Sequence, residues 1–304
     1  MKRTNELWKN KYFYLMALPA LAIYFLFSYA PMYGIIIAFK KFNYKDGILG
    51  SPWNGLNNFV FYFQTDDFYR TTVNTLWINF NNILWETVLA VLFAVFLNEI
   101  RSRFFKRTFQ ILMFLPYFFS AIIIGKFVTL LFSIDYGLVN QVIKGLGQQP
   151  VDWYLNPQYW VKILVGAHLW KHTGYSVIIY IATITGIDND LFEASSIDGA
   201  TRFQQIRSIL IPHLIPVVII LTLLSIGKIF FGNFDLIYAV TSNNGALIPT
   251  TDVIETYIYR SVRGGMQDFG MLGAVGLYQS VVGFILVMGS NLAVKKYNPD
   301  YSLF

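Results

Sequence analysis

Six long apolar segments constrain this chain more than any other feature of its sequence. An α-helix needs about 20 consecutive, mostly apolar residues to cross a lipid bilayer. The segments span residues 14–39, 73–97, 109–133, 161–185, 214–240 and 272–294. The sequence therefore predicts an all-α integral membrane protein with about six transmembrane helices.

The composition excludes a soluble fold for a chain with such segments. Of the 304 residues, 55% are hydrophobic and only 13% are charged, whereas soluble domains carry about 25% charged residues. So few charges could not cover the apolar surface left over once a core is built. Aromatic residues make up 18% of the chain, which fits rings placed along lipid and at its interfaces. The absence of Cys excludes a disulfide framework and a thiol nucleophile.

Lys and Arg residues beside the apolar segments predict the orientation of the chain. Twelve flank the segments on one side and seven on the other, and the cytoplasmic side carries the excess. We therefore interpret the net charge of +6 as a topology signal and not as a nucleic-acid surface. Both termini are expected in the cytoplasm. This interpretation gives a cytoplasmic tail over residues 1–13, a membrane domain over 14–304, a cytoplasmic connector over 186–212 and an outer segment over 241–270.

The outer segment contains the pattern of one short helix. Thr250, Thr251 and Asp252 are typical of a helix start, and Gly264 is typical of a helix end. Apolar residues between them recur on one face. Two interpretations stay open: a helix lying at the outer membrane interface, or a surface that meets a protein delivering the substrate.

The connector over residues 186–212 carries the most specific motif in the chain. It reads Glu193-Ala194-Ser195, three residues, Gly199, nine residues, and then Ile209-Leu210-Ile211-Pro212. An ordinary amphipathic connector does not explain so many matches at fixed spacing. The motif resembles the cytoplasmic signature of permease subunits of type I binding-protein-dependent ABC importers, which is E-A-A, three residues, G, nine residues and I-x-L-P. In this chain Ser replaces the second Ala of the signature, and Ile replaces its Leu.

In that family the motif forms an elbow that docks in a cleft on the ATPase subunit and transmits its motion. The resemblance implies an ATPase-coupling role for Glu193, Ala194, Ser195, Asp198, Gly199, Ala200, Ile209 and Pro212. The residues themselves predict two short helices joined at Gly199, because glycine readily adopts a positive φ.

Other stretches are similar to sugar permeases of the same family along nearly the whole chain. Examples are Leu18-Pro19, the run from Trp53 to Phe59, and the run from Asn233 to Ile237, which resembles the larger maltose-importer permease. The resemblance implies import of a sugar, expected to be an oligosaccharide, across the cell membrane of a Gram-positive bacterium. It also implies a second, non-identical permease, two ATPase subunits and an extracellular solute-binding lipoprotein as partners.

The chain has no G-x-x-x-x-G-K-[ST] sequence, so it cannot hold ATP through a P-loop. We therefore expect no enzymatic activity and no cofactor in this chain, with ATP and Mg bound by the partner ATPase subunits. No nucleic-acid partner is expected. His168 and His172 have the i, i+4 spacing of a metal pair, but no residue between them supplies a carboxylate. No metal site is predicted on that basis.

Polar residues inside the apolar segments point to a substrate path, because such residues usually face the bundle interior or a water-filled cavity. A sugar path needs hydrogen-bonding groups and flat aromatic faces. The residues that meet this description are Trp170, His172, Tyr175, Lys228, Phe231, Asn233 and Asp235. On a continuous fifth span, Lys228, Phe231 and Asp235 would share one face. The alternative is that these side chains pair with one another or reach the membrane interface.

Two other classes of function are weighed against the permease. A secondary transporter driven by an ion gradient would show inverted repeats and paired broken helices, and the sequence predicts neither. A membrane enzyme such as a glycosyltransferase would need convergent carboxylates or a metal site, whereas the acidic residues are scattered. The leading hypothesis is a permease subunit that forms half of a translocation path.

Overall fold

The computed structural model describes residues 9–265 and 268–303, so residues 1–8 of the predicted cytoplasmic tail lie outside the described part. Over the described residues the chain is helical, apart from turns, loops and one isolated bridge between Lys40 and Trp53. This confirms the predicted all-α class. The chain divides into two compact units, one of residues 1–64 and 264–278 and one of residues 65–263 and 279–304.

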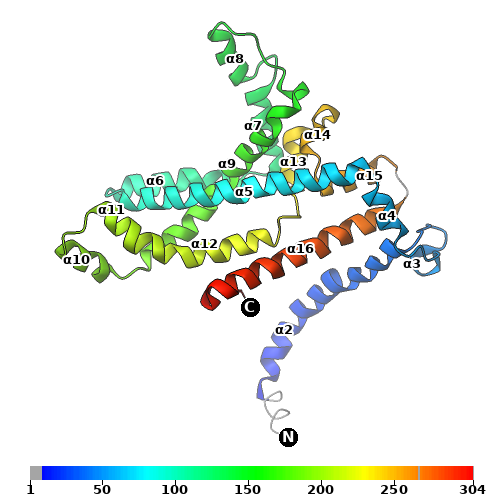
Figure 1. The fold of residues 1–304 in the computed structure, drawn as a ribbon, viewed down its shortest axis with the longest axis horizontal. Coiled ribbons are helices and arrows are strands. Elements are labelled where there is room, and N and C mark those ends of the chain that lie inside the picture. Colours follow the sequence, from blue (N-terminus) through cyan, green and yellow to red (C-terminus); the bar gives the residue numbers. More distant parts are fainter. Residues whose placement is uncertain (1–8, 266–267, 304) are drawn as a thin grey trace. The chain divides into compact units, whose positions relative to one another are not determined.

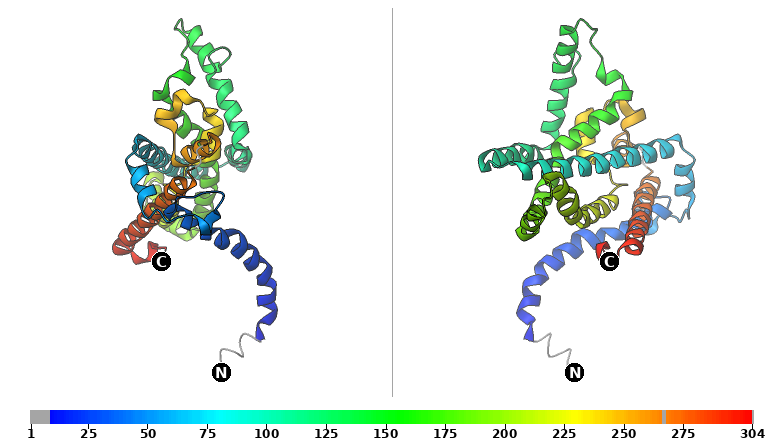
Figure 2. Two further views of the ribbon diagram at one scale, coloured as in Figure 1. Left: turned by 90° about the vertical axis from the view of Figure 1, so that its right-hand side faces the viewer. Right: turned by 60° about the vertical axis from the view of Figure 1, so that its left-hand side comes forward.

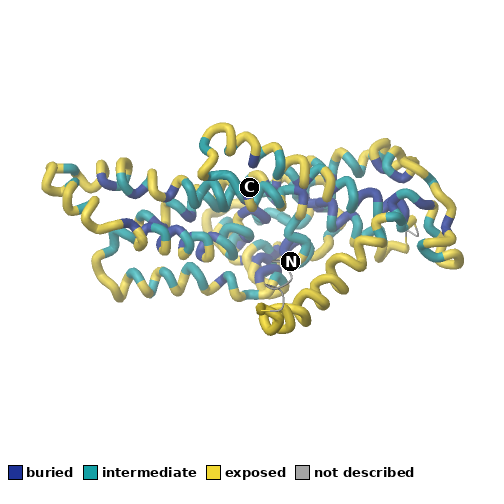
Figure 3. The backbone as a smooth tube through the Cα atoms, turned by 90° about the horizontal axis from the view of Figure 1, so that it is seen from below, coloured by how far each residue is buried: buried dark blue, intermediate teal, exposed yellow. Residues whose placement is uncertain are grey.

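The first unit begins with a long apolar helical stretch. Its helices are α2 (Lys11–Tyr24), α3 (Gly47–Gly50), α4 (Asn57–Phe63) and the first part of α16 (Phe269–Tyr297). Helix α2 continues through π- and 3-10-helical turns to Phe39. No residue of α2 is buried within the chain, and the helix is exposed along its length in Figure 3. An apolar helix exposed in this way requires lipid or another protein around it.

The second unit contains most of the helices. They are α5 (Asp66–Glu99), α6 (Arg103–Phe114), α7 (Ala121–Phe132), α8 (Leu138–Gly145), α9 (Trp160–Thr185), α10 (Asn189–Ile197), α11 (Arg202–Gln205), α12 (Ile211–Ile226), α13 (Phe234–Thr241), α14 (Ile248–Thr251), α15 (Ile254–Arg263) and the rest of α16. Helix α9 packs against the long helix α5 (Figure 1). Ala90 and Ala94 of α5 are fully buried beside Val177 and Tyr180 of α9. Small residues of this kind let two membrane helices approach closely.

Length and composition qualify four helical stretches of the described part as membrane spans, or five if one bent pair counts as a span. The four are Lys11–Phe39, Asp66–Glu99, Arg202–Ile226 and Phe269–Tyr297. The fourth predicted span does form a helix, α9, which carries His168, Lys171 and His172 and is not among these four. The count of about six spans therefore stays a prediction.

The third predicted span is bent and not straight. The stretch Arg103–Phe118 and helix α7 meet at 103° (Figures 1 and 2). Pro116 lies in the short 3-10 helix Leu115–Phe118 that ends the first arm. The Ser120 hydroxyl then caps α7 by accepting a hydrogen bond from the Ile123 N–H at 3.4 Å. Proline lacks the N–H that would continue the helix, and the serine cap begins a new one.

The fifth predicted span is also broken, so the expectation of a continuous helix over residues 214–240 is wrong, as is the expectation that no paired broken helices occur. Helix α12 ends at Ile226, and α13 begins at Phe234 with Asn233 as its cap. Non-helical backbone at membrane depth needs other hydrogen-bond partners. Three side chains supply them here.

Side chains from three other helices satisfy the backbone of this break. Asn79 of α5 donates to the carbonyl oxygens of Ile229 and Phe231, at 2.8 and 3.2 Å. Gln279 of α16 donates to the Phe230 carbonyl at 2.5 Å. Glu255 of α15 accepts from the Gly232 N–H at 2.6 Å. Specific side-chain hydrogen bonds therefore stabilise the break between α12 and α13.

Candidate functional site

Between α5, α9 and α12 lies a polar cavity of about 370 Å³, which we call the Glu86 cavity. Its lining residues are Ile83, Glu86, Thr87, Tyr117, His172, Tyr175, Ser176, Ile179, Tyr180, Leu221, Leu224, Ser225 and Lys228. Three of the predicted path residues, His172, Tyr175 and Lys228, meet here. The cavity borders both helix breaks, since Tyr117 precedes the first and Lys228 lies in the second.

Glu86 is the most firmly held polar group of this cavity. Its Oε2 lies 2.9 Å from Nε2 of His168, and its Oε1 accepts a hydrogen bond from the Ser176 hydroxyl at 2.6 Å. The rings of His168 and His172 lie 4.6 Å apart. Glu86 is not among the predicted path residues, because its partners His168 and Ser176 lie on another helix, α9.

Aromatic rings form a second wall of the cavity. Tyr117 and Tyr175 stack with ring centroids 4.9 Å apart and planes 14° apart. Lys171 does not enter the cavity lining; its ammonium group donates to the carbonyl oxygens of Tyr117 and Phe119 at the first helix break. The cavity thus combines flat rings, hydroxyl groups and a carboxylate, the chemistry that binds sugars.

The other predicted path residues lie elsewhere. Asp235 lines a separate cavity between α7 and α13, and Asn233 caps α13 by accepting from the Leu236 N–H at 3.3 Å. Trp170 contacts the Phe127 ring, with centroids 5.6 Å apart, beside apolar cavities. Phe231 lines neither polar cavity. The shared face predicted for Lys228, Phe231 and Asp235 is wrong, because the helix breaks between them.

The connector over residues 186–212 forms an elbow of two helices, α10 and α11. Gly199 joins them with φ at +79°, as predicted, and no atom lies within 4 Å of the position that a side-chain Cβ would take. Thr201 and Gln204 form a capping box that begins α11. Glu193 is exposed, as are the apolar side chains of Ile197 (87%) and Phe203 (70%). Exposed apolar side chains on a polar elbow are typical of a protein-binding surface.

Gln205 holds the two arms of the elbow together, and the sequence did not reveal this role. Its buried amide nitrogen lies 2.9 Å from the Ser195 hydroxyl, 2.8 Å from the Ser196 hydroxyl and 3.2 Å from the Phe192 carbonyl. The serine at position 195, which departs from the family signature, therefore takes part in this contact. Ala194, Asp198 and Ala200 lie on the elbow, Ile209 in the π-helical turn Ile206–Leu210 and Pro212 near the start of α12.

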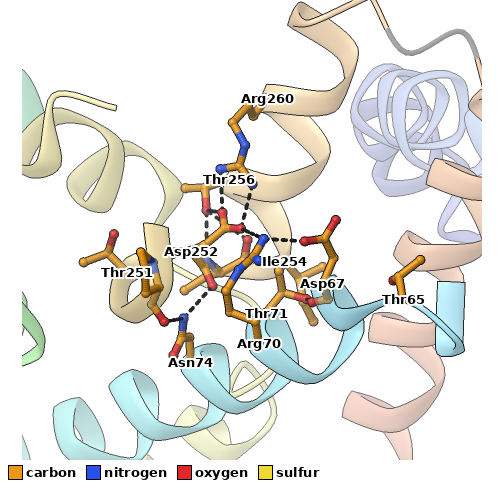
Figure 4. A network of polar contacts seen from close by, with 12 residues as sticks. Thr65, Asp67, Arg70, Thr71, Asn74, Thr251, Asp252, Ile254, Thr256 and Arg260 are labelled. Atoms are coloured by element: carbon orange, nitrogen blue, oxygen red, sulfur yellow. Dashed lines mark hydrogen bonds and ion pairs between the residues drawn. The ribbon is translucent and has the colours of Figure 1, made fainter. Parts of the chain in front are cut away.

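The outer segment is tied to the start of α5 by a buried carboxylate, shown in Figure 4. Asp252 accepts two hydrogen bonds from Arg260, at 2.8 and 2.7 Å, and one from Arg70 at 3.2 Å. Asn74 donates to the Asp252 carbonyl at 3.2 Å. The predicted helix of the segment is present as α15, which begins at Ile254 and ends at Arg263, just before Gly264.

Glu255 gives this region a predicted pH dependence. Burial raises the pKa of its carboxyl group above the ordinary value of 4.5, against hydrogen bonds from Gln279 and from the Gly232 N–H. A raised pKa means that the folded state favours the protonated form, so stability is lost as pH rises from about 4.5 through the raised pKa. We expect the melting temperature of the purified complex to fall over this window, and to fall less in Glu255→Gln. Parallel pH profiles for the two proteins would contradict the prediction.

No group of three or more His, Asp or Glu side chains within the described ranges is placed to hold a metal ion. The two polar cavities and the elbow are the features of the described residues that bear on function: a helical membrane protein with cavities of about 370 and 530 Å³ and an elbow with exposed apolar side chains.

The chain belongs to the family described as the binding-protein-dependent transport system inner membrane component, whose model matches residues 86–295. It is thus a multi-pass membrane subunit of a transport system, and the family is not enzymatic. The matched range begins at Glu86 and includes the elbow and both helix breaks.

Similar proteins cover almost the whole chain. The polygalacturonan/rhamnogalacturonan transport system permease protein YteP of Bacillus subtilis is 34% identical, over 97% of this chain and 91% of that one. The trehalose/maltose transport system permease protein MalF of Thermococcus litoralis is 30% identical over 93% and 92%. A crystal structure of a bacterial ABC transporter that imports the acidic polysaccharide alginate contains a chain with a TM-score of 0.89 and 29% identity, covering 98% of this chain and 100% of that one. A second alginate transporter structure, with a periplasmic protein bound to alginate pentasaccharide, gives a TM-score of 0.87, 29% identity and coverage of 96% and 97%.

Proposed function

We propose that this chain forms half of the translocation path of an ATP-driven importer for an oligosaccharide delivered by an external binding protein. The Glu86 cavity carries this proposal, because it combines rings, hydroxyl groups and a carboxylate between two broken helices. Non-helical backbone at membrane depth is tolerated where it lines a water-filled cavity. The relatives transport polygalacturonan or rhamnogalacturonan, trehalose or maltose, and alginate, according to their names.

The proposed assembly contains a second, non-identical permease and two ATPase subunits that bind ATP and Mg. The elbow supports this assembly, because its exposed Ile197 and Phe203 require a partner and its motif resembles that of ATPase-docking permeases. The excess of Lys and Arg on one side predicts that the elbow and both termini lie in the cytoplasm. The external binding protein is expected to be a lipoprotein, and the relatives from Bacillus subtilis favour a Gram-positive membrane.

The proposed substrate carries carboxylate groups. Two of the similar transporters act on polymers of uronic acids, namely polygalacturonan and alginate. Lys228 of the Glu86 cavity is exposed and supplies a cation to this path. A cleft with apolar walls focuses the field of such a cation on an anionic substrate.

The test is reconstitution of the purified complex in proteoliposomes, with labelled trigalacturonate and the cognate binding protein. We expect the chain to purify with a second permease and two ATPase subunits, and uptake to require internal ATP. Uptake driven by an ion gradient from a complex without an ATPase would contradict the proposal and favour a secondary transporter. Transport of maltotriose but not of trigalacturonate would be consistent with an importer and would contradict the proposal of an acidic substrate.

A further inference from the structure

A second polar cavity of about 530 Å³ lies between α7 and α13, and we call it the Lys126 cavity. Its lining residues are Ser120, Ala121, Ile122, Gly125, Lys126, Thr129, Phe234, Asp235, Tyr238, Ala239 and Ser242. Its walls are fixed by close backbone packing. A Cβ added to Gly125 would lie 2.4 Å from the Ala239 carbonyl oxygen, so only glycine lets the two helices approach this far.

Two opposite charges face this cavity without neutralising each other. Lys126 and Asp235 are both exposed, and among the described residues neither forms an ion pair or a hydrogen bond through its charged group. Charged side chains at membrane depth are costly and usually serve a substrate or ion path. Both groups are therefore available to a ligand.

Aromatic rings give the cavity a flat wall. Phe234 and Tyr238 of α13 stack with centroids 5.4 Å apart, and Tyr259 of α15 packs on both, at 4.9 and 5.1 Å. The Arg263 guanidinium donates to the Tyr238 hydroxyl at 3.0 Å and lies 3.3 Å from that of Tyr259. This arrangement fixes the ring orientation and adds a second cation next to the cavity.

We propose that the Lys126 cavity is a second sugar subsite of the path, selective for a uronic acid. Lys126 pairs with the carboxylate of the sugar, Asp235 accepts hydrogen bonds from its hydroxyl groups, and Phe234 and Tyr238 cover its apolar ring face. Ionised hydrogen bonds of this kind are about twice as strong as neutral ones. A neutral hexose would leave the ammonium group unpaired, which costs affinity.

The two cavities follow each other along the chain. Tyr117 of the Glu86 cavity and Ser120 of the Lys126 cavity flank the first helix break, and Lys228 and Phe234 flank the second. Both cavities therefore border the same two helix breaks. This inference rests on the proposed function and adds the residues that select the substrate class.

The absence of native Cys permits a direct binding test. Ser242→Cys exchanges one oxygen for sulfur in the cavity lining, and its modification by an anionic methanethiosulfonate is followed on this chain in the intact complex, with and without ATP. We expect 10 mM trigalacturonate to slow modification about tenfold or more, and maltotriose to change it less than about twofold. The Lys126→Met variant in the same background should lose the protection. Lys144→Met, an exposed lysine of helix α8, is the matched control and should keep it.

Equal protection by both sugars would overturn the uronate selectivity, and absence of protection by either would overturn the subsite. Protection that survives Lys126→Met would show that Lys126 does not bind the carboxylate of the sugar. Uptake by the same Ser242→Cys complex is measured in parallel. Normal uptake without protection refutes this inference alone, whereas loss of uptake for every sugar in the wild-type complex refutes the proposed function.

Discussion

Replacing Gly199 by valine is expected to abolish most substrate-stimulated ATP hydrolysis, whereas replacement by asparagine should preserve most of it. The φ of +79° lies in the left-handed region, which β-branched residues adopt only with strain of about 1–3 kcal/mol. Asparagine tolerates this conformation far better. No atom lies within 4 Å of the added Cβ, so the difference between the variants reports backbone strain and not a clash inside this chain.

The measurement is stimulated hydrolysis by the reconstituted complex, together with retention of the ATPase subunits during purification. Strain of this size shifts a docking equilibrium by roughly tenfold or more. Glu193→Ala should have a smaller effect, because an exposed ion pair contributes only about 0.2–1 kcal/mol. Substrate affinity at the external binding protein should be unchanged in all three variants. A Gly199→Val complex with wild-type stimulation would show that the elbow does not couple in the proposed way.

The elbow could be predicted because its information is local. Glycine at position 199, the caps of the short helices and the motif spacing all lie within one stretch of sequence, and the structure has the positive φ where it was expected. The contact made by Gln205 could not be predicted in the same way. Ser195 and Ser196 look like ordinary helix residues until the second arm folds back onto the first.

The helix breaks could not be predicted, because the contacts that stabilise them are not local in sequence. Residues 227–233 contain Ile229, Phe230 and Phe231, and the strongly apolar helices on either side extend the predicted span across the break. What stabilises the break comes from Asn79, Glu255 and Gln279, which are remote in sequence. The same argument explains Glu86, whose partners His168 and Ser176 lie on another helix. Polar residues inside apolar segments are costly to place in lipid, but only the fold shows which of them are paired.

Glu86→Ala is expected to have the largest effect on the path. The side chain of Glu86 is only 23% exposed and that of His168 15%, and leaving a largely buried hydrogen-bonding group without its partner costs about 1–3 kcal/mol. We expect the lower end of that range, because the carboxylate also faces the cavity. Alanine would leave the Ser176 hydroxyl and the His168 ring without their shared acceptor. A clear fall in melting temperature should accompany the loss of uptake.

Glu86→Gln separates the shape of this site from its charge. The amide can still accept from Ser176 and contact His168, so the melting temperature should stay close to that of the wild type. If the negative charge is needed to orient the two histidine rings next to Tyr175, uptake should nevertheless fall several-fold. The matched control is Asp66→Asn, which removes an exposed carboxylate from the first turn of the same helix. Because an exposed charge at a helix N-terminus contributes only about 0.3–1 kcal/mol, this control should leave the melting temperature close to that of the wild type and change uptake by less than about twofold. Wild-type uptake and melting in Glu86→Ala would mean that the substrate passes elsewhere, and the Glu86 cavity would then be only a polar contact between α5 and α9.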